Sequence, residues 1–380
     1  MDSTLASTIA EQYLLGWKVD ILAAKGLLNL AADVMFHGFP SDQCNLEDVA
    51  VRKEWSRLSK AERREYIDAV LCMQELPSKS DPEQFPGARN RYDDFVGIHI
   101  ALTLEIHGTA NFLTWHRYFT WAYEKALRDE CGYTGYQPYM NWGRYADNLL
   151  DSPVFDGSDT SMSGDGEYVE HDSVGIPSND QPLILLPPQN GGGCIMSGPF
   201  VNWTVNLGPV SPSLTYVSAN PQADGLGYNP RCISRDISPY VAQHWNKDED
   251  TADLIKNYND IESFQDHMQG DGFTNGFLGV HTGGHFMNGG DPGGDLFASP
   301  GDPYFFLHHA MIDRVFWTWQ NQDPRHRTNV VGGHITLNNS PPSAEGTLDD
   351  PLDIGVNGDT ITIGDAASTI GGTPFCYIYA

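Results

Sequence analysis

The sequence has few basic residues and no long hydrophobic run. Its 22 Lys and Arg residues stand against 50 Asp and Glu residues, which gives a formal net charge of −28. A surface of this charge repels phosphate backbones and anionic lipid headgroups, so nucleic acids and membranes are disfavoured as partners. No apolar stretch approaches the roughly 18 residues that span a bilayer. We therefore expect a protein that binds neutral or cationic ligands.

Closely spaced cysteines are also absent. The six cysteines are spread along the chain without a Cys-x-x-Cys pair, at positions 44, 72, 131, 194, 232 and 376. An even number at this spacing favours three disulfides over a zinc site and leaves the pairing open. The N-terminus lacks the basic and apolar regions of a secretory signal peptide, which leaves a cytosolic protein or a mature secreted chain. The cysteines and the glycosylation sequons at Asn202 and Asn338, the second weakened by a following Pro, favour a secreted glycoprotein.

The sequence does contain many aromatic residues. Hydrophobic residues make up 40% of the chain, with 9 Trp, 17 Tyr and 17 Phe, as expected of a folded protein. Apolar periodicity predicts helices over residues 5–36, 59–76, 92–105, 115–130, 251–269 and 303–322. Residues 165–235 are rich in Gly, Pro, Ser and Asp and indicate long loops, which a Cys194–Cys232 disulfide would pin and which we expect to shape the entrance to a site. No repeat or linker divides the chain, so we predict one domain over residues 1–380, mainly α with irregular loops and short strands.

Six of the 13 histidines fall into two similar groups: His99, His107 and His116, then His281, His285 and His309. A lone histidine is usually a satisfied core residue, and the zinc-protease pattern HExxH is excluded because Thr282 stands where that pattern has Glu. Three histidines without a thiolate or carboxylate suit a borderline metal such as Cu, Zn, Fe or Ni. Neutral imidazoles add no negative charge to the shell of metal ligands. Such a site favours binding of a ligand that brings negative charge, such as the peroxide formed when O2 is reduced. We infer two copper ions about 3.5–4 Å apart.

Around these groups the sequence resembles the tyrosinase and catechol oxidase family. HGTANFLTWHRYFTWAYE, from His107 to Glu124, matches the first copper motif of the family. DPYFFLHHAMID, from Asp302 to Asp313, matches the second, which hemocyanins share. The resemblance implies a type 3 dicopper centre in a central four-helix bundle, with a small phenol and O2 as substrates. It also implies the metal ligands: His99, His107 and His116 for the first copper, and His281, His285 and His309 for the second.

The second motif contains two adjacent histidines. The resemblance assigns the ligand role to His309, four residues before Asp313, and helical spacing places Phe305 on the same face as both. We expect His308 to point elsewhere, as a residue beside or behind the metals.

Neighbouring positions bear on the choice of substrate. By the resemblance, Thr282 and Phe286 each follow a ligand, and Leu296, with Phe297 as the alternative, occupies the gatekeeper position. We expect Phe286 and Phe305 to form an aromatic wall that stacks on the substrate ring.

Two features that support monophenol hydroxylation are absent. Members that hydroxylate phenols commonly carry Asn or Asp at the position of Thr282, and Glu at the position of Phe277 or Leu278. Their absence predicts a catechol oxidase, which oxidises o-diphenols to o-quinones and reduces O2 to water. Glu105 stands where fungal members often carry a Cys that links to the second ligand, so no thioether is expected there.

Three alternatives stay open. A tyrosinase with monophenol hydroxylation, or an o-aminophenol oxidase, would use the same site. A hemocyanin-like protein would bind O2 reversibly, although no large flanking domains accompany the site. A structural histidine-rich fold would have no activity.

Other residues of the motifs suggest structural roles. We expect Glu124 to be a buried partner of Arg117, or to bond the backbone, and Asp313 to bond the backbone and Arg314. The family's Tyr-x-Tyr motif, here Tyr377-Ile-Tyr379, lies one residue from the end, which predicts a short form without a shielding domain, most like the short fungal polyphenol oxidases. The remaining histidines are expected to be structural or on the surface: His37, His171, His244, His267, His326 and His334.

Overall fold

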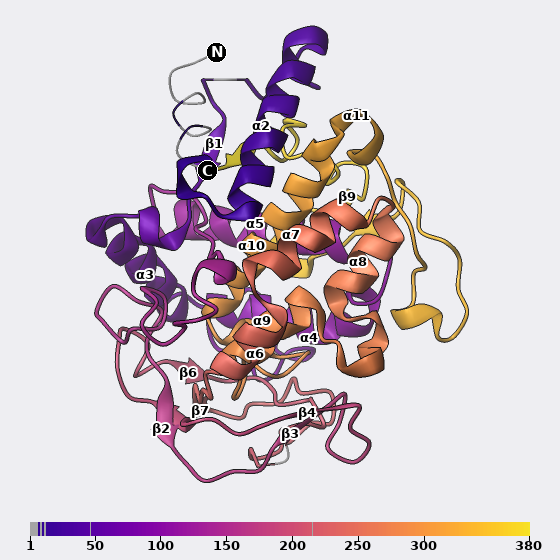
Figure 1. Cartoon of the computed structure of the whole chain (residues 1–380). Coiled ribbons are helices and arrows are strands. Elements are labelled where there is room, and N and C mark those ends of the chain that lie inside the picture. The colour runs from indigo at the N-terminus through magenta and orange to yellow at the C-terminus, as the bar shows by residue number, and fades with distance from the viewer. Residues whose placement is uncertain (1–6, 8–9, 11–12, 46, 215) are drawn as a thin grey trace.

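A computed structural model of the chain describes residues 7, 10, 13–45, 47–214 and 216–380 (Figure 1). Helices make up most of its regular structure. They are α2 (Lys18–His37), α3 (Lys60–Glu75), α4 (Arg91–Ile106), α5 (Phe112–Cys131), α6 (Pro239–Trp245), α7 (Asp248–Asn257), α8 (Ile261–Gln269), α9 (Gly279–Asn288), α10 (Tyr304–Gln322) and α11 (Pro324–Arg327). The predicted mainly α class is confirmed.

Helix α10 lies at the centre, and its residues from Tyr304 to Asn321 are all buried. A helix that is apolar or buried all round must be covered on every side, and α2, α5, α7 and α9 all pack against it. The helices α4, α5, α9 and α10 carry or flank both histidine groups. The predicted central helical core that holds the site is therefore confirmed.

Several predicted helix boundaries differ from those in the structure. The first predicted helix is interrupted before α2, where Gly16 adopts a left-handed φ of 75°; part of its beginning lies outside the described residues. The helix predicted over residues 251–269 is two helices, α7 and α8. Helix α9 was not predicted, because its Gly283 and Gly284 weaken the helical pattern. At α3 the predicted capping box is present between Ser59 and Glu62.

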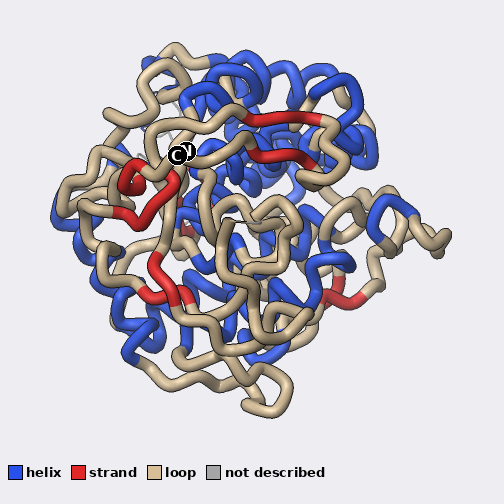
Figure 2. The backbone as a smooth tube through the Cα atoms, turned by 90° about the horizontal axis from the view of Figure 1, so that it is seen from below, coloured by secondary structure: helices blue, strands red, loops and turns tan. Residues whose placement is uncertain are grey.

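The chain between Asp151 and α6 makes a long excursion of loops and short strands below the helices in Figure 1. Three antiparallel strand pairs stiffen it, as seen from below in Figure 2: β2 (Gly166–Tyr168) with β5 (Gly192–Ile195), β3 (Val174–Ile176) with β4 (Ile184–Leu186), and β6 (Thr204–Val205) with β7 (Arg231–Cys232). The disulfide Cys194–Cys232 joins two of these pairs. The predicted loop-rich character of this segment and the predicted Cys194–Cys232 disulfide are both confirmed.

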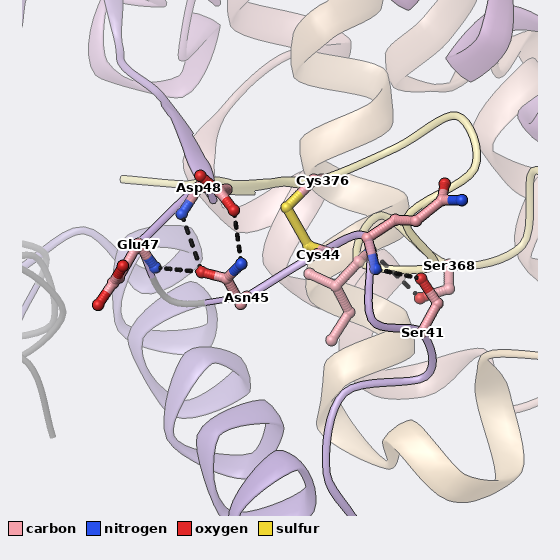
Figure 3. The surroundings of a disulfide bond; sticks show 9 residues. Ser41, Cys44, Asn45, Glu47, Asp48, Ser368 and Cys376 are labelled. Atoms are coloured by element: carbon pink, nitrogen blue, oxygen red, sulfur yellow. Dashed lines mark hydrogen bonds between the residues drawn. A yellow bond between two sulfur atoms is a disulfide. The ribbon is translucent and has the colours of Figure 1, made fainter.

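The C-terminal end returns to the N-terminal half of the chain. Strand β10 (Tyr377–Tyr379) runs parallel to β1 (Ala50–Arg52), and Cys44–Cys376 lies beside this pair (Figure 3). Cys72–Cys131 is the third disulfide, so the expectation of three is confirmed. A further antiparallel pair, β8 (Pro351–Leu352) with β9 (Ile361–Thr362), precedes β10.

The Tyr-x-Tyr segment ends in a buried charge cluster around Asp313. The carboxylate accepts hydrogen bonds from Arg117 Nε at 2.6 Å, Arg52 Nη1 at 3.3 Å, and the hydroxyls of Tyr377 and Tyr379 at 2.6 Å each. The two arginines hold the pKa of Asp313 below its usual value despite burial. This cluster fastens the last strand to the central helix.

One partner prediction in this region was wrong, because Arg314 pairs with Asp20 at 2.8 Å and not with Asp313. Glu124 takes the second of its two expected roles and accepts the backbone N–H of Gln137 at 2.7 Å, while its ion-pair partner is Arg52 at 2.9 Å and not Arg117. Both actual partners come from segments distant in sequence, which no local pattern reveals. None of the helices in the described part of the chain has the length and apolar character to cross a membrane.

Candidate metal centre

The first histidine group is built from α4, α5 and the turn that joins them. His99 lies within α4, His107 follows its last residue, and His116 lies one turn into α5. Each ring donates its Nδ1–H to a carbonyl: His99 to Phe297 at 2.7 Å, His107 to Thr103 at 2.9 Å and His116 to Phe112 at 2.8 Å. Two of these acceptors lie four residues earlier in the chain.

The Nε2 atoms of these three rings are buried and have no hydrogen-bond partner, and one ring nitrogen of each residue lies within 4.8 Å of those of the other two. With Nδ1 protonated, each Nε2 carries a lone pair. Buried acceptors without partners are costly, and three that converge fit a metal ion.

The second group lies on α9 and α10. His285 Nε2 lies 3.2 Å from His281 Nε2 and 3.2 Å from His309 Nε2. Tetrahedral ligands with metal–nitrogen bonds of about 2.0–2.1 Å would lie about 3.3 Å apart. The spacing therefore fits three nitrogens that share one ion. Packing orients these rings, because the Nδ1 atoms of His281 and His309 have no partner.

His308 belongs to the same neighbourhood but has a different environment. Its Nε2–H donates to the carbonyl of His281 at 3.0 Å, so this nitrogen is already used. The ring packs directly on Gly284, where any Cβ would overlap it, while a Cβ at Gly283 would overlap the Asn246 side chain. The two glycines of HTGGH thus let α9 approach α10 and the end of α6 closely.

The two groups face one another across stacked rings. The His116 and His309 rings are 4.5 Å apart and nearly parallel, and those of His107 and His281 are 5.8 Å apart. Phe305 stacks on His309 at 4.0 Å and meets His99 edge-on at 5.3 Å. The six histidines singled out from the sequence are brought together in one place.

Electrostatics keep these imidazoles neutral. Burial, reinforced by neighbouring histidines, lowers the pKa of His99, His116, His281, His285 and His309 well below the usual value. Burial also lowers the pKa of His107 to about 4 and that of His308 to about 3. Neutral rings leave their lone pairs free for two closely spaced borderline ions, a donor set suited to copper.

His285 alone among the six is not fully buried, so the centre is least covered on its side. Its neighbour Phe286 lines a crevice together with Val174, Leu186 and Leu214 from the long excursion. This contact supports the expectation that the excursion shapes the approach to the site.

The other sequence-selected positions take different places. Thr282 is half buried, and its hydroxyl donates to the carbonyl of Gln269 at 3.0 Å. Leu296 is 41% exposed, whereas Phe305 is only 2% exposed. Phe305 therefore packs behind the histidines, where it excludes water, and does not form an open wall as Phe286 does. Phe297 is half buried.

Sequence reasoning missed the carbonyl of Phe297 and the residue Gln269. No pattern could have found the first, since every residue has a carbonyl. The histidines outside the two groups make other contacts, such as the ion pair of His171 with Asp236 at 2.9 Å.

Comparison with known proteins shows the family to which the chain belongs. The sequence profile of the common central domain of tyrosinase matches residues 89–322. Tyrosinase-like protein orsC from Emericella nidulans is 43% identical over 78% of this chain and 80% of its own length. N-acetyl-6-hydroxytryptophan oxidase ivoB from the same organism is 39% identical over 93% of this chain and 98% of its own length. The solved structure of a single-site mutant of polyphenol oxidase from Thermothelomyces thermophila is 41% identical in sequence. The match covers 96% of this chain and 98% of that chain, with a TM-score of 0.88.

The chain belongs to the tyrosinase family, a class of oxidoreductases. Membership implies a dinuclear copper centre that uses O2, and the two histidine groups are compatible with it.

Proposed function

We propose that the protein oxidises o-diphenols to o-quinones while O2 is reduced to water. Two copper ions would be held by His99, His107 and His116 on one side and by His281, His285 and His309 on the other. The observation that carries the proposal is the convergence of six neutral imidazoles, five of them buried, in two groups whose ring nitrogens lie close together.

The copper pair, when bound, supplies two-electron exchange with O2 and with the diphenol. Two diphenol molecules give up four electrons and four protons, which convert one O2 into two water molecules. The role of the protein chain is to hold the histidine rings in place and to shield the centre from water. The carbonyl acceptors fix the ring of each histidine of the first group, and Phe305 closes the space behind His309 and His99. We place the approach of the substrate ring on the side of His285, the one proposed ligand that is not fully buried.

The preference for diphenols rests on the absence of a carboxylate at the positions where phenol-hydroxylating members carry one; Asp236, a carboxylate of the crevice beside Phe286, is already paired with His171 at 2.9 Å. Phe277 and Leu278 are apolar, and the hydroxyl of Thr282 is bonded to Gln269. A monophenol must lose its only hydroxyl proton before it is oxidised, and these three residues offer no carboxylate to accept it. A catechol is more easily oxidised by two electrons and needs less assistance.

A second candidate is oxidation of a hydroxyindole. Its support is the 39% identity, over nearly the full length of both chains, to the protein named N-acetyl-6-hydroxytryptophan oxidase. Such a substrate carries a single phenolic hydroxyl on an electron-rich ring, which lowers the need for a base.

The test is oxygen uptake by the copper-loaded protein with 4-methylcatechol, 4-methylphenol and 6-hydroxyindole in parallel. Uptake with the catechol well above that with the phenol supports the proposal. Equal rates on the catechol and the phenol would make the protein a phenol-hydroxylating tyrosinase. Uptake with 6-hydroxyindole alone would select the second candidate. The matched control is His285→Ala, which should abolish all uptake.

We further propose that the chain forms one catalytic domain and works outside the cytosol. Three disulfides persist best in an oxidising compartment. The sequon at Asn202 has an exposed asparagine, as glycosylation requires. Endoglycosidase treatment of the protein from its natural host, followed by a mass measurement, tests that site.

A further inference from the structure

His107 differs from the other five proposed ligands in its backbone setting. Those five lie inside helices, whereas His107 follows the last residue of α4 and has an extended backbone, with φ −126° and ψ 142°. The next residue, Gly108, adopts a left-handed φ of 57°. All six cysteines are in disulfides, so none is available to fix this histidine covalently. Hydrogen bonds at the next residue hold the turn that carries it.

Both peptide groups of Gly108 are held by distant segments. Its N–H donates to Gln269 Oε1 at 2.8 Å, and its carbonyl accepts from the N–H of Asn338 at 2.9 Å. Asn338 lies in the short 3-10 turn Leu337–Asn339, far along the chain from Gly108. A Cβ at position 108 would overlap Asn338 and touch Leu337, so the turn fits only glycine here.

Gln269 also contacts the other half of the centre. Its carbonyl accepts the hydroxyl of Thr282, the residue after His281, at 3.0 Å. Its side chain is aimed by a hydrogen bond from Nε2 to the carbonyl of Gln265 at 3.1 Å. One residue at the end of α8 thus bonds the residue after His107 with its side chain and the residue after His281 with its backbone.

We propose that Gln269 is a positioning residue that fixes the His107 turn and links it to α9, so that the two metal-binding groups keep their spacing. The proposal rests on the proposed copper function. Gln269 itself touches neither the metals nor the substrate, and it acts through Gly108 and Thr282. Without its amide oxygen, the Gly108 N–H loses its acceptor and the His107 ring gains freedom to swing. Copper at the first group should then be held less well than copper at the second.

The experiment measures copper loss to an excess of chelator in single-site backgrounds. His309→Ala leaves the first group intact, and His116→Ala leaves the second group intact. Adding Gln269→Leu, which keeps the size and removes the acceptor, should speed copper loss in the His309→Ala background about 10- to 100-fold. In the His116→Ala background the change should stay below about threefold, a small fraction of that range.

Two further variants keep the test decisive. Gln269→Glu keeps an oxygen for the Gly108 N–H and should restore most of the copper retention. Thr282→Val cuts only the link to α9 and leaves the acceptor at position 269 in place; it should speed loss from the first group severalfold. The matched control is Gln322→Leu, which removes a glutamine amide that bonds Leu22 and Thr318 carbonyls far from the turn; it should leave both rates unchanged.

The outcomes separate the two proposals. A wild-type protein that binds two coppers, while Gln269→Leu matches Gln322→Leu or Thr282→Val has no effect, would overturn the positioning role alone. Equal acceleration at both sites would also overturn it, because the effect would then be general loosening. A wild-type protein that binds no copper would overturn the proposed dicopper function and this inference with it.

Discussion

Replacing Asp313 by Asn tests whether the buried charge cluster stabilises the fold. Asp313 and Glu124 together balance the guanidinium groups of Arg117 and Arg52, and all four side chains are at most 7% exposed. The variant leaves one positive charge unbalanced in the interior. It also turns the amide NH2 group of the new Asn toward arginine and tyrosine groups that donate hydrogen bonds to Asp313. Loss of one partner from a buried pair costs about 3–5 kcal/mol. We therefore expect the free energy of unfolding to fall by about that amount.

The assay is urea unfolding followed by tryptophan fluorescence at a fixed copper concentration. Tyr377→Phe and Tyr379→Phe each remove one hydroxyl bonded to the carboxylate and should cost about 1.5–3 kcal/mol. The control is Asp129→Asn, which removes an exposed pair with Lys125 and should cost less than about 0.5 kcal/mol.

The pH dependence gives a second check on the same variant. The arginines lower the pKa of Asp313 in the folded protein, so its contribution is complete above the unfolded pKa of about 3.9 and fades as the pH falls toward the folded value. The difference between wild type and Asp313→Asn should therefore shrink below about pH 4. A loss no larger than that of Asp129→Asn at neutral pH would refute the reasoning.

The remaining predictions concern the site and a second buried acid. His309→Ala should bind one copper per chain and His308→Ala two, measured by atomic emission; equal loss in both would show that the assignment within the pair is wrong. Thr282→Asn should raise the rate on 4-methylphenol relative to 4-methylcatechol severalfold, and an unchanged ratio would mean that proton removal is not limiting. Burial raises the pKa of Asp93 to about 6. Its ionisation therefore costs the folded protein about 3 kcal/mol between pH 4 and pH 6. The stability of Asp93→Asn relative to wild type should therefore rise by about that amount over the interval, and parallel stability curves would contradict this.

Much of the site could be predicted because its determinants are local. His281 and His285 are four residues apart on one helix face, and His309 and Asp313 repeat that spacing. The texture of residues 165–235 identified the irregular excursion, and its crevice beside Phe286 agrees with a role in access. Helix α9 was missed because Gly283 and Gly284 are poor helix formers, and they are tolerated because Asn246 and His308 pack where a side chain would otherwise lie.

The sequence by itself determined the helical class, the three disulfides and the two groups of histidines, because these follow from residue type and short-range spacing. Only the tertiary structure decided which carbonyl orients His99, which arginine balances Glu124, and that Gln269 joins the turn after His107 to α9. Each of those contacts connects positions far apart in the chain: His99 and Phe297 are separated by 198 residues, and Gly108 and Gln269 by 161. A hydrogen bond depends on where two groups lie in space, and that placement is set by how the helices pack, which no local pattern records.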